Sequence, residues 1–271
     1  MPAVSSDSDA QLYKEVRGLS RGLAVLRALN ALPGGIGGVM ELARITGIHR
    51  TTVKRLLETL KAEGLVHHKD DGVSYALGFE VRRLSEGYVA ADWIDRVAAP
   101  AMRDHLKSLS WPSDLATPDS GFMIVRESTH RSSLLSQHRA TIGIRIPMLV
   151  SSLGRAWLAW CAYEEREATL ALLRERKDGI GEIARDTAQV KRMIRETRRR
   201  GYGVNRGEWL SEASVTAIAF PILVGGHAIG AINLVLQSSL ASERDISSRY
   251  VPLLRSLAEE ISAGTDRFPK E

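Results

Sequence analysis

The stretch "ELARITGIHRTTVKRLLETL", residues 41–60, constrains the fold of this chain more than any other. Two helical patterns meet at Gly47, and glycine tolerates the left-handed backbone of a tight turn. Ala43 is a small residue where the second helix would cross the first. After the turn, one apolar stripe with helical spacing consists of Val53, Leu56, Leu57 and Leu60. The stretch therefore predicts a helix-turn-helix.

The start of the second helix is basic and rich in hydroxyl groups. The candidate DNA-binding residues there are His49, Arg50, Thr51, Thr52, Lys54 and Arg55. An arginine can fork onto guanine, a threonine can bond to a base or a phosphate, and a lysine neutralises phosphate. The helix N-terminus adds backbone N–H groups and the positive end of a dipole. We predict a helix that reads the major groove of DNA, and the alternative is a helical hairpin with a solvated charged face.

A hairpin signal follows the two helices directly. The pair Asp71-Gly72 predicts a turn between short strands at 65–69 and 73–77. A hairpin in this position is typical of a winged helix, and it favours the DNA-binding interpretation. Lys69, near the tip, is a candidate for contact with phosphate or the minor groove.

Positive charge is concentrated in the same part of the chain. Residues 14–69 hold 10 Lys and Arg and 4 Glu, a net charge of +6, whereas the whole chain carries +5. A local basic excess is typical of a nucleic-acid-binding domain. Within it, Arg17, Arg21 and Lys54 are predicted to contact the DNA backbone.

The length of 271 residues predicts two domains, because a domain holds roughly 100–200 residues. The predicted organisation is a disordered tail at 1–13, a winged helix-turn-helix at 14–78, a linker helix at 79–95 and a second domain at 96–271. In the second domain we predict strands at 121–128, 132–140, 217–224 and 228–236, and helices within 151–176, 186–203 and 240–264. This order predicts an α+β fold with a sheet and flanking helices.

Several other classes of protein are disfavoured. The chain has no nucleophile-elbow, phosphate-loop or dinucleotide-binding motif, so we predict neither an enzyme nor a catalytic residue. Seven scattered histidines and one cysteine, Cys161, predict no metal site, no disulfide and no cofactor. The most apolar segment, 215–236, contains Pro221 and a Gly-Gly pair, which is unsuitable for a membrane helix. With no visible signal peptide, the sequence predicts a cytoplasmic protein without a membrane partner.

Five stretches in order resemble the IclR family of bacterial transcription regulators, over about residues 14–265. They are "VRGLSRGLAVLRAL", "ELARITGIHRTTVKRLLETLKAEGLV", "GIRIPMLVSSLGRAWLAW", "RRRGYGVNRGEW" and "AIAFPILVGGHAIGAINLV". The resemblance implies a winged helix-turn-helix, a linker helix and a GAF-like effector domain with an antiparallel sheet. It also implies a homodimer or homotetramer that binds a double-stranded DNA operator and a small organic acid. Within the family the chain is most similar to activators of hydroxyphenylpropionate catabolism. The stretches that suggest it are "RGLSRGL", "HRTTVKRLLETL", "VRRLSEGY", "WPSD" and "VRESTHR".

The resemblance implies an effector pocket whose carboxylate-binding end lies at the start of the helix in "SSLGRAWLAW". Carried over residue by residue, the pocket positions are Ser151, Ser152, Leu153, Gly154, Asn205, Ala217, Asn233 and Val235. A serine cap and free backbone N–H groups at a helix start favour an anion, and the alternative is a plain capped helix. Where family members that bind small keto acids have polar residues, this chain has Ala217 and Val235. That departure favours a larger, more apolar acid.

Some residues near this helix have two interpretations. A partner for the effector carboxylate could come from Arg126, His130, His138, Arg139 or Arg145. The alternative for each is a solvated charge at the edge of a strand, which we favour. Trp111 and Trp157 could line an aromatic pocket, although a buried core position is the commoner role.

The sequence predicts a DNA-binding regulator, an activator of an aromatic-acid catabolic operon controlled by an aromatic carboxylic acid such as a hydroxyphenylpropionate. Two alternatives stay open. One is a repressor of the same family that responds to another small organic acid, and the other is a DNA-binding protein whose second half serves only to oligomerise. RNA polymerase is a further partner that the activator interpretation implies.

Overall fold

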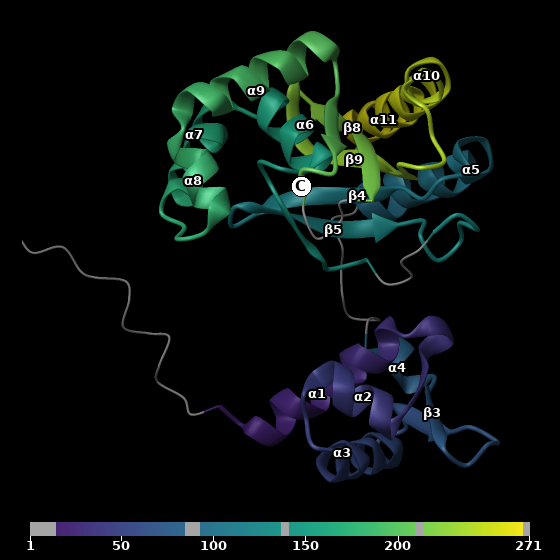
Figure 1. The fold of residues 1–271 in the computed structure, drawn as a ribbon. Helices are drawn as coiled ribbons and strands as arrows, with labels where there is room; N and C mark the ends of the chain where they lie inside the picture. The colour runs from purple at the N-terminus through teal and green to yellow at the C-terminus, as the bar shows by residue number, and fades with distance from the viewer. Residues whose placement is uncertain (1–14, 85–92, 137–140, 210–213, 268–271) are drawn as a thin grey trace, which may run out of the picture. The chain divides into compact units, whose positions relative to one another are not determined.

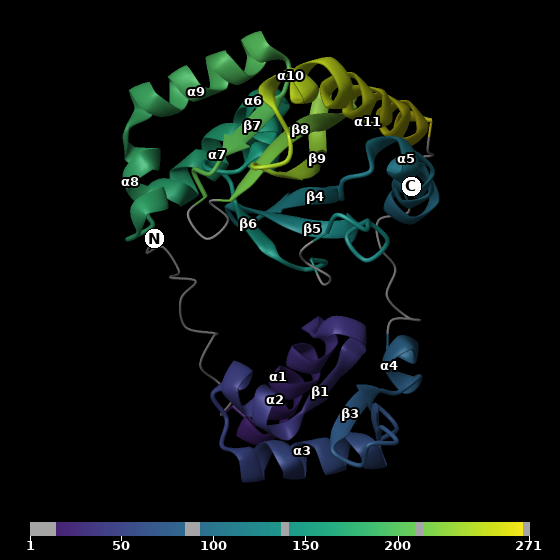
Figure 2. The same cartoon turned by 45° about the vertical axis from the view of Figure 1, so that its right-hand side comes forward.

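In a computed structural model of the chain, residues 15–84, 93–136, 141–209 and 214–267 are described. They form two compact units, one within residues 1–89 and the other within 90–271, and each is described by itself (Figures 1 and 2). The predicted tail at 1–13 lies outside the described residues. So does the middle of the predicted linker helix, at 85–92.

The first unit is a winged helix-turn-helix (Figure 1). Its helices are α1 (Arg17–Ala31), the 3-10 turn η2 (Pro33–Gly35), α2 (Val39–Thr46), α3 (Arg50–Ala62) and α4 (Glu80–Arg83). Its antiparallel sheet has the order β1-β3-β2, built from β1 (Ile36–Gly38), β2 (Val66–His68) and β3 (Ser74–Leu77). Strands β2 and β3 are the two arms of the predicted wing.

The turn between α2 and α3 forms as the sequence predicts. Gly47 ends α2 in the left-handed conformation, with φ 69°, and its N–H donates to the carbonyl of Ala43 at 3.0 Å. The two helices and α1 then enclose a small core. Its fully buried members include Val25, Leu29, Leu42, Val53 and Leu57. The helix-turn-helix prediction is therefore confirmed.

Helix α1 is buried along only part of its apolar stripe. Leu26 and Leu29 lie in the core of the first unit. Leu19 and Leu23, at the start of the same stripe, are 63% and 41% exposed, and the preceding Val16 is 68% exposed. An exposed apolar stripe of this kind is typical of a surface that contacts a partner.

The second unit is built on one antiparallel sheet of six strands with the order β6-β5-β4-β9-β8-β7. The strands are β4 (Asp114–Asp119), β5 (Phe122–Ser128), β6 (Arg145–Pro147), β7 (Gly203–Arg206), β8 (Val215–Val224) and β9 (His227–Gln237). The helices are α5 (Ala99–Leu109), α6 (Ser152–Trp160), α7 (Tyr163–Arg174), α8 (Gly179–Arg185), α9 (Thr187–Arg200), α10 (Glu243–Asp245) and α11 (Val251–Asp266). Two π-helical turns, η3 (Ile94–Ala98) and η5 (Ile246–Tyr250), lead into α5 and α11.

Helices cover both faces of this sheet (Figure 2). The side chains of β8 alternate between the two faces. Ile218, Phe220 and Ile222 point into a large apolar cluster with α5 and α11. Ala219 belongs to the opposite cluster, where α6 packs on the sheet. A small residue on that face lets α6 approach the strands closely. The α+β prediction is confirmed.

One predicted strand is wrong, and four of the described strands were not predicted. Residues 132–136 form turns and not a strand, and 137–140 lie outside the described residues. The Ser133 hydroxyl donates to the carbonyl of Ser110 at 3.0 Å and accepts from the N–H of Leu135. Such local bonds compete with strand pairing. The strands that were not predicted are β1 in the first unit and β4, β6 and β7 in the second.

Candidate DNA-binding surface and ligand pocket

Helix α3 separates its packing face from its polar face, as predicted. Val53 and Leu57 are fully buried, and Leu56 and Leu60 pack against the same core. Around the helix start, Arg50, Thr51, Lys54 and Arg55 are exposed, and Thr52 is half-buried. These side chains are therefore available to a second molecule along one side of the helix.

His49 is the N-cap of α3. Its Nδ1 atom accepts from the backbone N–H of Thr51 at 3.4 Å and lies 2.9 Å from the Thr51 hydroxyl. A capping side chain satisfies a backbone donor that the first helical turn leaves without an intrahelical acceptor. The predicted residue thus acts on the start of the helix, and it is itself exposed.

Glu58 ties α3 to the wing. One carboxylate oxygen, Oε1, accepts from the Tyr75 hydroxyl at 2.6 Å and lies 3.2 Å from Nε2 of His68. The other, Oε2, accepts from Nζ of Lys61 at 3.1 Å. The hydrogen bond from Tyr75, followed by that from Lys61, lowers the pKa of Glu58 to about 2. Burial, with the neighbouring Glu58, raises the pKa of Tyr75 to about 12.

The tip of the wing is held by its own backbone. The Asp71 carboxylate accepts from the N–H groups of Ser74 at 2.8 Å and of Val73 at 2.9 Å, and these bonds lower the pKa of Asp71. The N–H of Lys69 donates to the carbonyl of Ser74. The Lys69 side chain is exposed beside this tip, and Arg17 and Arg21 are exposed on α1.

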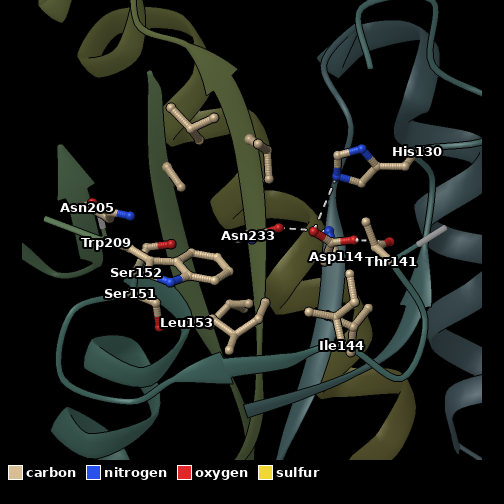
Figure 3. A pocket seen from close by; sticks show the side chains of 15 residues that line it. Asp114, His130, Thr141, Ile144, Ser151, Ser152, Leu153, Asn205, Trp209 and Asn233 are labelled. Atoms are coloured by element: carbon tan, nitrogen blue, oxygen red, sulfur yellow. Dashed lines mark hydrogen bonds and ion pairs between the residues drawn. The ribbon is translucent and has the colours of Figure 1, made fainter. Parts of the chain in front are cut away.

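The second unit contains a pocket on the sheet face that α6 covers (Figure 3). Strand pairing sets Asn205 of β7 opposite Ala217 of β8, and Ala217 opposite Val235 of β9. Asn233, two residues before Val235, points to the same face. The described lining comprises Asp114, Val125, His130, Thr141, Ile144, Ile146, Ser151, Ser152, Leu153, Asn205, Trp209, Val215, Ala217, Asn233 and Val235.

One end of the pocket is the start of α6. Ser151 is the N-cap, accepting from the N–H of Gly154 at 3.1 Å and donating to the carbonyl of Pro147 at 2.6 Å. The N–H groups of Ser152 and Leu153 have no acceptor within the helix, because they lie in its first turn. Asn205 lies at the same end (Figure 3). This end offers several hydrogen-bond donors and the positive end of the helix dipole.

The side-chain amide of Asn205 has an Nδ2 group that is available as a hydrogen-bond donor. Its Oδ1 atom accepts from the backbone N–H of Glu208 at 2.9 Å, and the residue is 3% exposed. This bond fixes the amide so that the Nδ2 group takes the other position. Among the described residues, that group has no hydrogen-bond partner. It is therefore available to a molecule in the pocket.

The opposite end of the pocket holds Asp114, His130 and Thr141 (Figure 3). The Thr141 hydroxyl donates to Oδ1 of Asp114 at 3.0 Å, and Nε2 of His130 lies 3.3 Å from Oδ2. Asp114 is 4% exposed and His130 is 3% exposed, so this is a buried polar cluster. The backbone N–H of Asp114 donates to Oδ1 of Asn233 at 2.7 Å.

Apolar walls connect the two ends. Leu153 and Trp209 lie between them in Figure 3, and Ile144 lies beside Asp114. The remaining wall residues are Val125, Ile146, Val215, Ala217 and Val235. The cavity volume is about 90 Å³. This is several times the roughly 10–15 Å³ that a single water needs, so the space suits a small organic molecule.

Gly154, predicted as a pocket residue, lies behind the lining and has a structural reason to be glycine. A Cβ atom there would lie 2.1 Å from the carbonyl oxygen of Met148 and 2.4 Å from its Cα atom. Its N–H, expected to be free for an anion, is instead occupied by Ser151. The other seven predicted pocket residues do line the cavity.

Arg155 does not place its charge in the pocket. Its guanidinium donates to the carbonyls of Leu149 and Val204 and forms an ion pair with Glu208 at 2.9 Å. Burial alone would raise the pKa of Glu208, but the hydrogen bonds from Arg155 and the Arg206 backbone hold it below the usual value. This pair therefore braces the chain that carries Asn205.

The other candidates for the carboxylate partner have different roles. Arg126 donates to the Thr117 hydroxyl at 2.9 Å, and the Arg145 guanidinium stacks over the ring of Phe122 at 4.4 Å. His138 and Arg139 lie outside the described residues. His130 lines the pocket, but at the end away from α6.

The aromatic residues in the pocket differ from those considered in the sequence. Trp111 and Trp157 are buried in the two cores, and Trp111 donates to the Tyr250 hydroxyl at 3.1 Å. Trp209 lines the cavity instead. Asp114 and Trp209 end two of the stretches that carry the resemblance, "WPSD" and "RRRGYGVNRGEW", but neither they nor Thr141 were predicted to line the pocket. No pattern in one sequence brings such separated residues together.

Cys161 has no chemical role in the pocket. Cys161 is 4% exposed in the core beneath α6, and burial raises the pKa of its thiol to about 11.

The described part of the chain contains no cluster of three or more metal-binding side chains. Within the same part, no helix is long and apolar enough to cross a membrane.

Two family profiles cover most of the chain. The IclR helix-turn-helix domain matches residues 18–70, and the bacterial transcriptional regulator IclR C-terminal domain matches residues 87–263. The first match runs from the second residue of α1 to beyond β2, and the second contains every described residue that lines the pocket.

Relatives and solved structures agree with these matches. The transcriptional repressor IclR of Escherichia coli is 25% identical over 76% of this chain and 74% of its own length. The p-hydroxybenzoate hydroxylase transcriptional activator of Acinetobacter baylyi is 26% identical over 94% of both chains. The crystal structure of an IclR family transcriptional regulator from Brucella abortus is 26% identical, with a TM-score of 0.56 over 96% of both chains.

Proposed function

This chain belongs to the IclR family of bacterial transcriptional regulators and is a DNA-binding regulator, not an enzyme, and from that premise we propose its regulatory role. We propose that it activates an aromatic-acid catabolic operon when an aromatic carboxylic acid, such as a hydroxyphenylpropionate, binds in the pocket of the second unit. The observation that carries the proposal is the combination of a donor-rich end and apolar walls in that pocket.

The α6 end suits the carboxylate of the ligand. First-turn N–H groups of α6, the Ser152 hydroxyl and Nδ2 of Asn205 are hydrogen-bond donors that converge there. Ser152 and Asn205 are 2% and 3% exposed, so an anion held by them is shielded from water. Charge-assisted hydrogen bonds to a carboxylate are stronger than bonds between neutral groups.

The walls suit a ring rather than a second polar group. Ala217 on β8 and Val235 on β9 offer only apolar surface on the strands between Asn205 and Asp114, and Trp209 and Leu153 add further apolar lining. A small, very polar acid would lose its water there without gaining hydrogen bonds. An aromatic ring buries apolar area against the same side chains.

The exposed face of α3 is the proposed reader of DNA. Arg50, Thr51, Thr52 and Arg55 are the proposed contacts to bases or nearby phosphates, with His49 at the helix start. Arg17, Arg21, Lys54 and Lys69 are the proposed contacts to the DNA backbone. The support is that all of these residues but the half-buried Thr52 are exposed on the first unit.

We further propose that the protein acts as a homodimer, or as a tetramer of two dimers. The exposed stripe of Leu19 and Leu23 on α1, with Val16 just before the helix, supports a contact between DNA-binding halves. In this proposal residues 14–78 bind DNA, 79–95 link, and 96–271 bind the effector. The ligand shifts the arrangement of the DNA-binding pair only by its differential affinity for the two arrangements.

The direction of regulation rests on similarity. The activator relative of Acinetobacter baylyi matches over nearly the whole chain and favours activation, with RNA polymerase as a partner. The similarity to the IclR repressor of Escherichia coli favours the second candidate, a repressor that responds to another small organic acid. In both cases the protein would act in the cytoplasm.

The test is fluorescence anisotropy with labelled DNA from upstream of the protein's own gene and a scrambled duplex as the control. Each is titrated with and without 3-(3-hydroxyphenyl)propionate, at two salt concentrations. The proposal expects tight, salt-sensitive binding to the upstream duplex alone and an effector-dependent change. Equal weak binding to both duplexes, unaffected by the acid, would contradict it.

A further inference from the structure

Asp114 is a buried residue whose carboxylate lines the pocket. It has no part in the proposed binding of the ligand carboxylate at the α6 end. Asp114 belongs to β4 and Asn205 to β7, and strands β9 and β8 lie between them. Three strand spacings of roughly 4.8 Å separate their backbones by about 14 Å. The Asp114 carboxylate therefore lies at the far end of the pocket from the donors around α6.

The Asp114 carboxylate has acceptor capacity left for a ligand. Two oxygens offer about four lone-pair positions. The Thr141 hydroxyl uses one and His130 uses another. The Ser128 hydroxyl is 2.7 Å from that of Thr141 and supports the bond from Thr141 to Asp114. The carboxylate is thus held in place while part of it still faces the cavity.

Asn233 supplies a donor beside this acceptor. The backbone N–H of Asp114 binds Oδ1 of Asn233, which fixes the amide so that Nδ2 is the other group. Asn233 is 5% exposed and lines the cavity, and Nδ2 has no hydrogen-bond partner among the described residues. A carboxylate acceptor and an amide donor therefore adjoin the same space.

A hydroxyl group is the ligand group that fits both neighbours, because it donates one hydrogen bond and accepts others. We propose that Asp114 selects a ligand with a hydroxyl at the end opposite its carboxylate: the hydroxyl donates to Asp114 and accepts from Nδ2 of Asn233. The buried charge of Asp114 also excludes a second carboxylate from this end. The inference rests on the proposed function, because it concerns the same aromatic acid.

The charge of Asp114 further sets the direction in which the ligand binds. A carboxylate at the Asp114 end would meet a like charge in a water-poor site, whereas the α6 end offers N–H donors. Only one orientation therefore satisfies both ends. Asp114 is a specificity-determining residue in this scheme, and Thr141 and His130 position it.

Isothermal titration calorimetry of the full-length protein tests the proposal with matched acids. The first series is 3-(3-hydroxyphenyl)propionate, 3-phenylpropionate and 3-(3-methoxyphenyl)propionate, and 4-hydroxybenzoate with benzoate covers a shorter scaffold. The hydroxy acid of the preferred scaffold should bind roughly 10- to 150-fold more tightly than its unsubstituted partner, as expected for a hydrogen bond to a charged group. The methoxy compound, which cannot donate, should bind no more tightly than 3-phenylpropionate.

The Asp114→Asn variant should reduce the hydroxyl preference by about tenfold while its affinity for 3-phenylpropionate stays near that of the wild type. It should also bind 3-(3-carboxyphenyl)propionate, which the wild type should exclude. A gain of binding would not follow from a merely structural role. Asp119→Asn is the matched control, because Asp119 lies on the same strand but is exposed.

Equal affinity of the wild type for hydroxylated and unsubstituted acids on both scaffolds would overturn the selection by Asp114 and leave the aromatic-acid proposal standing. Binding of none of these acids would overturn both. If Asp114→Asn fails to fold, as judged by its melting curve, the wild-type series alone decides, because hydroxy, unsubstituted and methoxy acids differ only at the group in question.

Discussion

At the scale of single residues, Glu58 shows how one side chain connects two elements. Its carboxylate accepts from Tyr75 on β3 and from Lys61 on its own helix, and it lies beside His68 on β2. These bonds favour the charged form and lower its pKa to about 2. The contact spans α3 and the wing, so the same bonds that stabilise the charge fix the wing against α3.

The first prediction concerns acid. Because the folded-state pKa of Glu58 is lowered from 4.5 to about 2, its stabilisation is present above about pH 4.5 and is lost as the pH falls from 4.5 to 2. Urea unfolding monitored across this window should therefore show a shallower loss of stability for Glu58→Gln than for the wild type. Glu63→Gln, at the exposed end of the same helix, is the control. Parallel curves for wild type and Glu58→Gln would contradict the role assigned to these bonds.

At the scale of elements, the start of α6 depends on a close approach that only glycine permits. A Cβ atom on residue 154 would overlap the backbone of Met148. Gly154→Ala should therefore displace the start of α6, lower the free energy of unfolding by about 1–3 kcal/mol and weaken ligand binding. Chemical denaturation and calorimetry measure the two effects.

Gly179→Ala is the matched control for that change. Gly179 starts α8, and an added Cβ atom would meet nothing within 4 Å among the described residues. This variant should unfold like the wild type or slightly later, because alanine restricts the unfolded chain. If Gly154→Ala and Gly179→Ala lowered the free energy of unfolding equally, crowding at the start of α6 would not explain the loss of stability in Gly154→Ala.

The proposed DNA-reading helix α3 carries the second element-scale prediction. Arg50→Ala combined with Arg55→Ala should weaken binding to the operator at least tenfold, since each lost base contact costs about 1–3 kcal/mol. Binding to a scrambled duplex should change less. Lys107→Ala, an exposed lysine of α5, is the control. If the double variant kept the wild-type ratio of affinities for the operator and the scrambled duplex, α3 would not read the DNA sequence.

The elements that could be predicted are those whose local signals agree with their packing. Gly47 and the stripe from Val53 to Leu60 define the helix-turn-helix without further context. Strand β4, with the sequence "DLATPD", has no strand-like pattern, and it forms because β5 and β9 pair with it on both sides. Residues 132–136 show the reverse case, in which two leucines suggested a strand but serine bonds form turns.

The pocket residues also fall into a group that could be predicted from the sequence and a group that could not. The α6 residues and Asn205, Ala217, Asn233 and Val235 came from the resemblance, and all of these except Gly154 line the cavity. Asp114, His130 and Thr141 meet only because β4, the turn after β5 and the chain before β6 converge. Contacts between such distant segments depend on the fold and leave no spacing in the sequence.

At the scale of the whole molecule, the exposed stripe on α1 supports the proposed association of two chains. If the protein is the proposed dimer, Leu19→Glu with Leu23→Glu should convert it to a monomer in sedimentation and reduce operator affinity at least tenfold, because two linked sites bind more tightly than one. Leu240→Glu, also an exposed leucine, is the control. A double variant that remained dimeric would place the contact elsewhere.

The buried thiol of Cys161 has a practical consequence for measuring, in solution, how the proposed dimer responds to the acid. Only the thiolate reacts with maleimides, and with a pKa of about 11 and 4% exposure Cys161 should remain unmodified at neutral pH. The native chain can therefore be treated as if it had no cysteine. A cysteine introduced at Asp70, exposed on the wing, would accept a single dye. Energy transfer between two dyes in a dimer would then report the spacing of the wings as the acid is added.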